Sequence, residues 1–247
     1  VRRAVAARAR SPRAAPDEPP PRRLWAATEV LRFARSPFAC WLDAAVATAP
    51  PERKKALVAL RDPVDPFSQL LAAKGDAWER DVRDALASTR SVVDLSTPNV
   101  RRDPSAAASK TADALRAGAD VIYQAPAVGG SFLGVPDLLV RDGDAYQIWD
   151  AKLSRAATPS HVMQLCCYAE LLEDLCPDVT ISPIATLALG GAGPLESLRP
   201  VDLPAYAASW RRLRARFLAF ADRFESTDEP WALKDAPAPR GDAPRDA

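Results

Sequence analysis

The chain has 247 residues, of which 48% are hydrophobic and 26% are charged, and its formal net charge is +1. This composition is typical of a globular protein and supplies enough large apolar residues for a sizeable core. No run of about 18 apolar residues is free of charge, which excludes a conventional membrane-spanning helix. Four cysteines without a CxxC pair argue against a disulfide framework and favour a reduced, cytoplasmic location.

Both ends of the chain have the composition of unstructured segments. Residues 1–23 contain seven arginines, five prolines and two acidic residues, and residues 227–247 contain four prolines and few apolar residues. Such segments cannot bury enough surface to offset the entropy lost on ordering. We therefore expect one domain over residues 24–226 between two disordered tails. That domain carries a net negative charge, so any contact with a polyanion must come from a local patch or from the N-terminal tail.

Helices are expected in the first half of the domain. Residues 26–49 predict two short helices interrupted at Ser36-Pro37, and residues 66–88 predict a longer one from apolar residues at three- and four-residue steps. A further helix over residues 105–117 should end at Gly118, because glycine is common in the left-handed position after a helix.

The second half predicts strands and two more helices. Strands are expected at 121–128, 132–140 and 145–153, joined by short turn-rich links that favour an antiparallel meander. The remaining elements are a helix at 158–175, a strand at 180–189 and a helix at 204–225. Thr158 as the N-cap and Pro159 in the first turn mark the start of the first of these helices. The fold class is therefore α/β.

Three charged residues interrupt the apolar pattern of the meander. Asp137 lies between aliphatic residues of one strand, and Asp150 and Lys152 lie in the next. Side chains on a strand alternate between faces, so Asp150 and Lys152 share a face. If the turn at 141–144 pairs the two strands, Asp137 lies opposite or diagonal to Asp150. Two carboxylates that close repel each other unless a cation joins them, and Mg²⁺ or Mn²⁺ prefers such oxygen ligands.

This pattern resembles the signature of the PD-(D/E)XK nuclease superfamily. Pro136-Asp137 matches its "PD", and Asp150-x-Lys152 matches its "(D/E)XK". On the helix that follows, Gln164 and Tyr168 are similar to the QxxxY motif of the RecB-like branch, which includes CRISPR-associated RecB-like exonucleases. Glu79, in Gly-Asp-Ala-Trp-Glu, is similar to that branch's first motif. The resemblance covers about residues 26–190.

The resemblance implies a restriction-endonuclease-like core, with the order α-β-β-β-α-β, a central mixed sheet flanked by helices, and added N- and C-terminal helices. It implies that Asp137, Asp150 and the carbonyl of Ala151 bind the metal, with Glu79 as a further ligand. Lys152 is then the residue that orients or deprotonates water. Gln164 and Tyr168 are then the residues that contact the substrate or position Lys152.

These assignments have alternatives in ordinary structure. Glu79 lies among other charged residues and could belong to a solvated helix face, while Gln164 and Tyr168 could line the edge of the core. His161, the only histidine, is expected to be an exposed or helix-terminal polar residue and not a ligand. Four arginines of the last helix form a solvated face or contact phosphate: Arg211, Arg212, Arg214 and Arg216.

The cysteines do not support an iron–sulfur cluster. Some RecB-like nucleases bind one with a cysteine before the first motif and three after the last core helix. Cys40 matches the first position, but no cysteine follows Cys176, and Cys166 and Cys167 lie inside the QxxxY helix.

The sequence thus predicts a Mg²⁺- or Mn²⁺-dependent nuclease that hydrolyses DNA, acting as an exonuclease or on single strands in DNA repair, recombination or defence. RNA is an alternative substrate, a helicase or another nucleic-acid-processing domain is an expected partner, and no membrane is involved. The alternative function is a nucleic-acid-binding module with a nuclease fold and no catalysis. A plain α/β scaffold with structural ion pairs is the third hypothesis.

Overall fold

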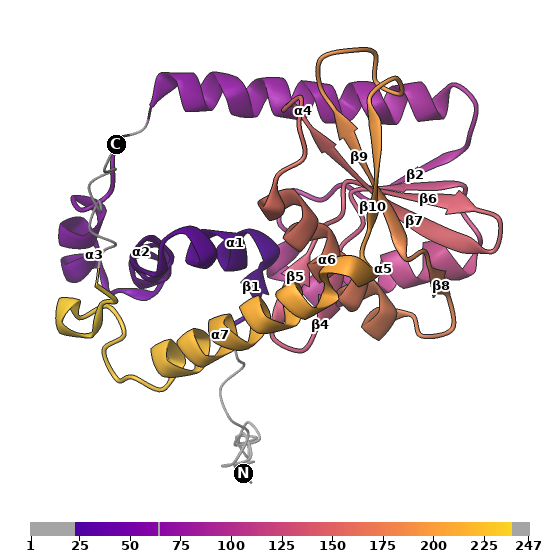
Figure 1. Cartoon of the computed structure of the whole chain (residues 1–247). Helices are drawn as coiled ribbons and strands as arrows, with labels where there is room; N and C mark the ends of the chain where they lie inside the picture. The colour runs from indigo at the N-terminus through magenta and orange to yellow at the C-terminus, as the bar shows by residue number, and fades with distance from the viewer. Residues whose placement is uncertain (1–22, 64, 239–247) are drawn as a thin grey trace, which may run out of the picture.

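The protein is a mixed α/β structure in which helices flank a central mixed sheet (Figure 1). The computed structural model describes residues 23–63 and 65–238. The predictions for residues 1–22 and 239–247 lie outside the described residues. Within the described part there are seven α-helices, and none of them is long and apolar enough to cross a bilayer.

The central sheet has seven strands in the order β10-β9-β7-β6-β3-β2, with β8 beside the start of β7. β6 pairs antiparallel with both β3 and β7, whereas β7 pairs parallel with β9. The predicted antiparallel pairing around the turn at 141–144 is therefore confirmed. The strands are β2 (Val92–Asp94), β3 (Val121–Tyr123), β6 (Leu138–Asp142), β7 (Ala145–Lys152), β8 (Thr180–Ile181), β9 (Ile184–Leu189) and β10 (Leu198–Asp202).

The first two predicted strands are each divided between two sheets, which the sequence pattern did not predict. A small second sheet contains β1 (Trp25–Ala26), β5 (Phe132–Gly134) and β4 (Ala127–Gly129) in that order. The chain leaves the central sheet at Gln124, which has a left-handed backbone with φ of 51°. Pro126 follows Gln124 on the first segment, and Pro136 lies between β5 and β6 on the second. Proline has no N–H to continue a ladder. The predicted strand 180–189 is interrupted at Ser182-Pro183 into β8 and β9, which both remain in the central sheet beside β7.

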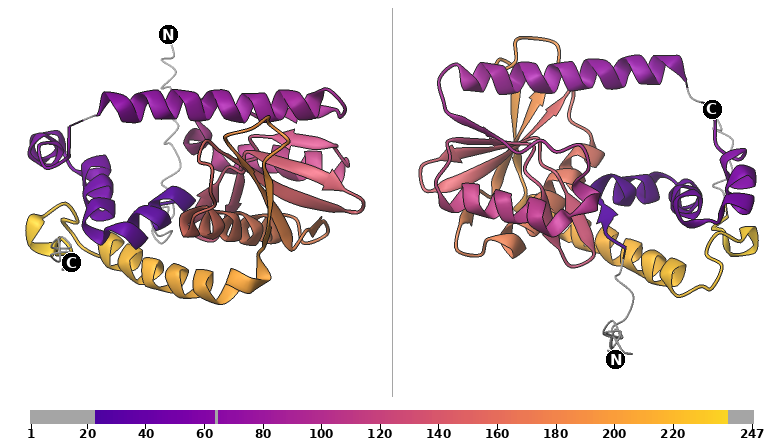
Figure 2. Two further views of the ribbon diagram at one scale, coloured as in Figure 1. Left: turned by 45° about the horizontal axis from the view of Figure 1, so that its top comes forward. Right: turned by 180° about the vertical axis from the view of Figure 1, so that it is seen from behind.

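The two faces of the central sheet are covered by different helices (Figure 2). α4 (Pro66–Ala87) packs on one face, where Val82 and Leu86 join Leu138 and Val140 of β6 in one apolar cluster. α5 (Pro104–Arg116) and α6 (Pro159–Leu175) cover the other face and belong to the larger cluster. The predicted helices at 66–88, 105–117 and 158–175 are thereby confirmed. Gly118 has the expected left-handed backbone, with φ of 73°.

Four helices form a second group beside the sheet, built on aromatic packing. They are α1 (Ala27–Arg35), α2 (Pro37–Thr48), α3 (Pro51–Val58) and α7 (Ala207–Glu225). Trp25 and Phe33 pack edge-to-face on Phe217 of α7, with ring centroids 5.3 and 5.6 Å apart. The break at Ser36-Pro37 is confirmed, because Ser36 accepts the backbone N–H of Ala39 as an N-cap.

The remaining short elements are 3₁₀-helices, which were not predicted as separate elements. They are η1 (Val100–Arg102), η2 (Pro204–Tyr206) and η3 (Leu233–Asp235). η3 lies in the segment that the composition predicted as unstructured. There Trp231 packs against the main core, and the indole of Trp41 donates a hydrogen bond to the carbonyl of Pro230 at 2.8 Å. Residues 227–238 therefore have defined contacts with the domain.

Candidate metal centre

The two predicted carboxylates lie on neighbouring strands at the same level of the sheet. Leu138 of β6 pairs with Trp149 of β7, and continuing this antiparallel register by one residue places Asp137 opposite Asp150. Both side chains follow the alternation of the face that α6 covers, since Leu139 and Ile148 belong to the cluster on that side. The structure thus brings together the pair that the sequence singled out.

Asp150 is a buried carboxylate with one oxygen left unsatisfied. The residue is 0% exposed, and Oδ1 accepts no hydrogen bond from the described residues. Oδ2 faces the Lys152 ammonium, whose Nζ lies 2.6 Å away. A buried carboxylate with unsatisfied oxygens is costly, so such groups are normally paired or bound to a metal. Asp150 therefore has the bonding capacity that a cation would use.

Asp137 is oriented by the strand beside it. Its Oδ2 accepts a hydrogen bond from the backbone N–H of Ala151 at 2.8 Å. The carboxylate thus serves as the acceptor for a β7 N–H where β6 begins. Burial raises the pKa of Asp137 well above its usual value, and the neighbouring Asp150 raises it further, while Lys152 and the Ala151 N–H oppose the shift. Asp137 thus tends to retain a proton until a cation compensates the charge of the site.

Lys152 stands next to both carboxylates. Burial alone would lower the pKa of this ammonium group, but Asp150 and Asp137 outweigh burial and raise it. Lys152 is therefore charged at neutral pH and contributes one positive charge to a site with two acidic groups. The predicted position of Asp150 and Lys152 on one strand face is confirmed by their ion pair.

α6 presents the two motif residues of its helix to this site. Gln164 Nε2 donates a hydrogen bond to the hydroxyl of Tyr168 at 2.7 Å, one helical turn further along. Burial raises the pKa of Tyr168 well above its usual value, and the carboxylates of Asp150 and Asp137 add to the shift. The phenol therefore stays protonated and lies within electrostatic range of both carboxylates.

Glu79, the further predicted ligand, is on the opposite side of the sheet. It projects from α4, where the side chain of Gln124 and the hydroxyl of Tyr123 donate hydrogen bonds to it. Its charge reaches the site, because it raises the pKa of both Asp137 and Lys152. In the part of the chain that the structure describes, however, no three acidic, histidine or cysteine side chains are close enough to form a ready-made metal site.

Gln124 is a site residue that sequence analysis missed. Its left-handed backbone lets its N–H donate to the carbonyl of Asp137 at 2.8 Å while its side chain donates to Glu79. A non-glycine residue in this region is uncommon, and such positions cluster at functional sites. The only signal in the sequence was a glutamine just before Ala125-Pro126, which is too common to predict this conformation.

The residues present fit a divalent cation of the hard type. Asp137 and Asp150 supply facing carboxylates, Asp150 Oδ1 lacks a donor among the described residues, and Lys152 supplies positive charge beside the pair. Such oxygen ligands suit Mg²⁺ or Mn²⁺. The four cysteines, Cys40, Cys166, Cys167 and Cys176, are all buried and unbridged. The prediction that this chain holds no iron–sulfur cluster stays untested.

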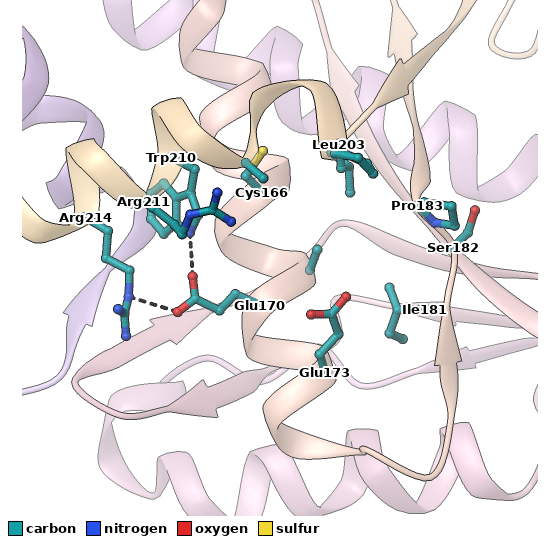
Figure 3. A pocket seen from close by; sticks show the side chains of 13 residues that line it. Cys166, Glu170, Glu173, Ile181, Ser182, Pro183, Leu203, Trp210, Arg211 and Arg214 are labelled. Carbon is teal, nitrogen blue, oxygen red and sulfur yellow. Dashed lines mark hydrogen bonds and ion pairs between the residues drawn. The ribbon is translucent and has the colours of Figure 1, made fainter.

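The arginines of α7 lie away from this centre. Arg214 pairs with Glu170 of α6 at 2.9 Å, and Trp210 donates to the same carboxylate, beside a cavity of about 420 Å³ (Figure 3). The α6 residues that line this cavity, such as Cys166 and Glu173, lie on the helix face opposite Gln164. Arg211, Arg212 and Arg216 are exposed. A phosphate contact by this cluster stays a prediction.

Comparison with known proteins gives no family for this chain. No protein-family model matches the sequence, and no curated protein was found with significant similarity to it.

Proposed function

We propose that this protein is a divalent-metal-dependent nuclease of the PD-(D/E)XK superfamily, RecB-like branch, that hydrolyses phosphodiester bonds of DNA. The observation that carries the proposal is the buried Asp150 carboxylate, which lies opposite Asp137, pairs with Lys152 through Oδ2 and leaves Oδ1 without a donor among the described residues. Hydrolytic phosphoryl transfer needs charge neutralisation and an activated water, and these groups suit both.

The order of elements around the centre supports the finer fold proposal. α4, β3, β6, β7, α6 and β9 occur in the order α-β-β-β-α-β around the mixed sheet, with β2 and α5 inserted between α4 and β3 and β8 before β9. This is the order implied for a restriction-endonuclease-like core, and the small sheet and the α1–α3 and α7 helices are additions to it.

Each residue of the centre has a role in the proposal. Asp137 and Asp150 hold Mg²⁺ or Mn²⁺, with the carbonyl of Ala151 as an added ligand and Glu79 as an acidic group behind them. When bound, the cation supplies positive charge that polarises the phosphate and lowers the pKa of the attacking water. Lys152 holds that water or stabilises the negative charge that develops on the phosphate.

Gln164 and Tyr168 act from the α6 side. Their mutual hydrogen bond fixes both side chains, and the protonated phenol lies within electrostatic range of the carboxylate pair. A fixed donor of this kind positions the substrate backbone or the Lys152 ammonium. We propose DNA as the substrate, RNA as its alternative, a cytoplasmic setting in repair or defence, and a helicase or similar domain as partner.

The experiment that tests this function compares the wild-type chain with Asp150→Ala. Purified protein is incubated with labelled linear and circular DNA, single- and double-stranded, with Mg²⁺ or Mn²⁺ and with a chelator. The proposal expects metal-dependent cleavage by the wild type and none by the variant. Full cleavage by Asp150→Ala contradicts it, while cleavage of linear DNA alone identifies an exonuclease.

One observation favours the alternative of a binding module without catalysis. Lys152 contacts Asp150 directly, and the described residues contain no ready-made group of three ligands. A wild-type chain that binds Mn²⁺ and DNA but cleaves no DNA or RNA substrate supports this second function.

A further inference from the structure

His161 shares a helix face with the two motif residues of α6. It precedes Gln164 by three positions and Tyr168 by seven, and residues at these spacings lie in one stripe along a helix. The Tyr168 end of this stripe lies within range of the charges of Asp150 and Asp137. His161 is therefore the next residue of the same stripe toward the start of α6.

One nitrogen of the imidazole is committed to the start of the helix. Nδ1 accepts the backbone N–H of Thr158 at 3.3 Å, and the hydroxyl of Thr158 accepts the backbone N–H of His161 at 3.4 Å. This reciprocal capping fixes the ring and, in the neutral form, places the proton on Nε2. Nε2 has no hydrogen-bond partner among the residues that the structure describes, so a donor is left free.

Burial, helped by two nearby cations, favours the neutral form of the ring. Burial lowers the pKa of His161, and Lys152 and Arg35 lower it further, while Asp150 acts in the opposite sense. Arg35 reaches this end of α6 from α1, where it donates to the hydroxyl of Ser160 at 3.3 Å. The free Nε2–H is thus a neutral donor within electrostatic range of Lys152, Arg35 and Asp150.

Capping alone does not require a histidine here. Glutamate or glutamine is the usual third residue of a capping box. A glutamate at this position would add a third carboxylate near Asp150 and repel a phosphate. Histidine provides the same capping acceptor without negative charge and adds a donor on the far side of the ring.

We propose that His161 is a substrate-contacting residue whose Nε2–H donates to a phosphate oxygen of the bound strand, on the α6 side of Lys152. This inference rests on the proposed nuclease function. The His161 contact is a neutral hydrogen bond to the phosphate. It therefore contributes to the affinity for DNA and to the position of the strand without releasing a counterion.

Two substitutions separate the roles of the two ring nitrogens. In His161→Asn the side-chain oxygen can replace Nδ1 as the capping acceptor, but nothing replaces Nε2. In His161→Gln the amide reaches the place of Nε2 and can still cap. Thr158→Ala is the control for capping, since it lowers the melting temperature without removing the donor.

The measurements are cleavage of single-stranded DNA and equilibrium binding of a fluorescein-labelled phosphorothioate oligonucleotide in Ca²⁺. We expect His161→Asn to weaken binding or kcat/KM about ten- to a hundredfold, with an unchanged salt slope, and His161→Gln to stay near the wild type. Wild-type behaviour of His161→Asn overturns the inference alone, as does an equal loss in both variants. A wild-type chain that neither binds nor cleaves DNA overturns the nuclease function and this contact together.

Discussion

The two faces of the central sheet use the same strands for different purposes. On the α4 side, Leu138 and Val140 pack on Val82 and Leu86, and the polar residue Glu79 has its hydrogen-bond donors supplied. On the α6 side, Asp150 is buried, and its Oδ1 has no donor among the described residues. A face whose polar groups all have hydrogen-bond partners contributes to stability. A face with an unsatisfied buried carboxylate has a free acceptor that a ligand can bind.

The largest expected effect is a difference in cleavage activity between substitutions on the two faces of the sheet. Asp137→Asn and Asp150→Asn should each lower metal-dependent cleavage on the order of 10³-fold or more, because each removes a charge that holds the cation. Glu79→Gln, on the other face, should keep most of the activity. Rates of oligonucleotide cleavage at saturating Mn²⁺ measure the difference. Equal losses in all three variants would erase the distinction between the faces.

The ion pair on the α6 side gives the next largest effect. Lys152→Met keeps the aliphatic stem but removes the charge beside the buried Asp150. Breaking a buried pair in this way should lower the free energy of unfolding by about 3 kcal/mol in metal-free protein. Added Mn²⁺ should restore much of the loss, because the cation replaces the missing positive charge. Denaturant melts with and without Mn²⁺ test this, with the exposed Lys234→Met as control.

Metal-free protein should also lose stability as the pH rises. The pKa of Asp137 is raised by burial and by Asp150, so between pH 3.8 and that raised pKa the folded state holds a proton that the unfolded state has lost. The contribution of Asp137 to stability is therefore complete below pH 3.8 and is lost as the pH rises through the raised pKa, by at most about 1.4 kcal/mol per pH unit. Asp137→Asn should flatten the profile.

Asp178 provides a control of opposite sign for this profile. Its hydrogen bonds to Arg116 lower its pKa, so its contribution to stability is present above pH 3.8 and is lost on acidification. Asp178→Asn should leave the loss at rising pH intact. A wild-type profile that is flat over this range contradicts the raised pKa of Asp137.

The smallest effect concerns the α4 side. Gln124 links the two faces, since its N–H binds the carbonyl of Asp137 and its side chain binds Glu79. Gln124→Ala should reduce the affinity for Mn²⁺ about three- to tenfold by releasing Glu79, which acts behind the carboxylate pair. Calorimetric titration measures this affinity. If both Gln124→Ala and Glu79→Gln leave the affinity for Mn²⁺ unchanged, Glu79 does not contribute to the metal site.

The sequence predicted the α6 side of the site well because strand alternation is a strong local rule. The spacing of Asp150 and Lys152, and the short turn before β7, fix which side chains meet. It did not predict the α4 side, where the outcome depends on the left-handed backbone of Gln124 and on how a long helix lies across the sheet. Long-range packing of this kind leaves no periodic signal in the chain.

The fold shows the same contrast between local and non-local information. Helix starts with a capping residue before proline were predicted, as at Ser36-Pro37 and Thr158-Pro159. The division of strand 132–140 between two sheets was not predicted, because an apolar run says nothing of which partner each half pairs with. The short strands β2 and β10 depend on non-local pairing and were also missed.

Binding of Mn²⁺ to the purified chain tests the central claim most directly. Isothermal titration calorimetry should show that the wild type binds Mn²⁺ with release of protons, since Asp137 gives up its proton when the cation arrives. Asp150→Asn should abolish this heat while Glu79→Gln retains it. Equal Mn²⁺ binding by the wild type and Asp150→Asn would contradict a metal centre between β6 and β7.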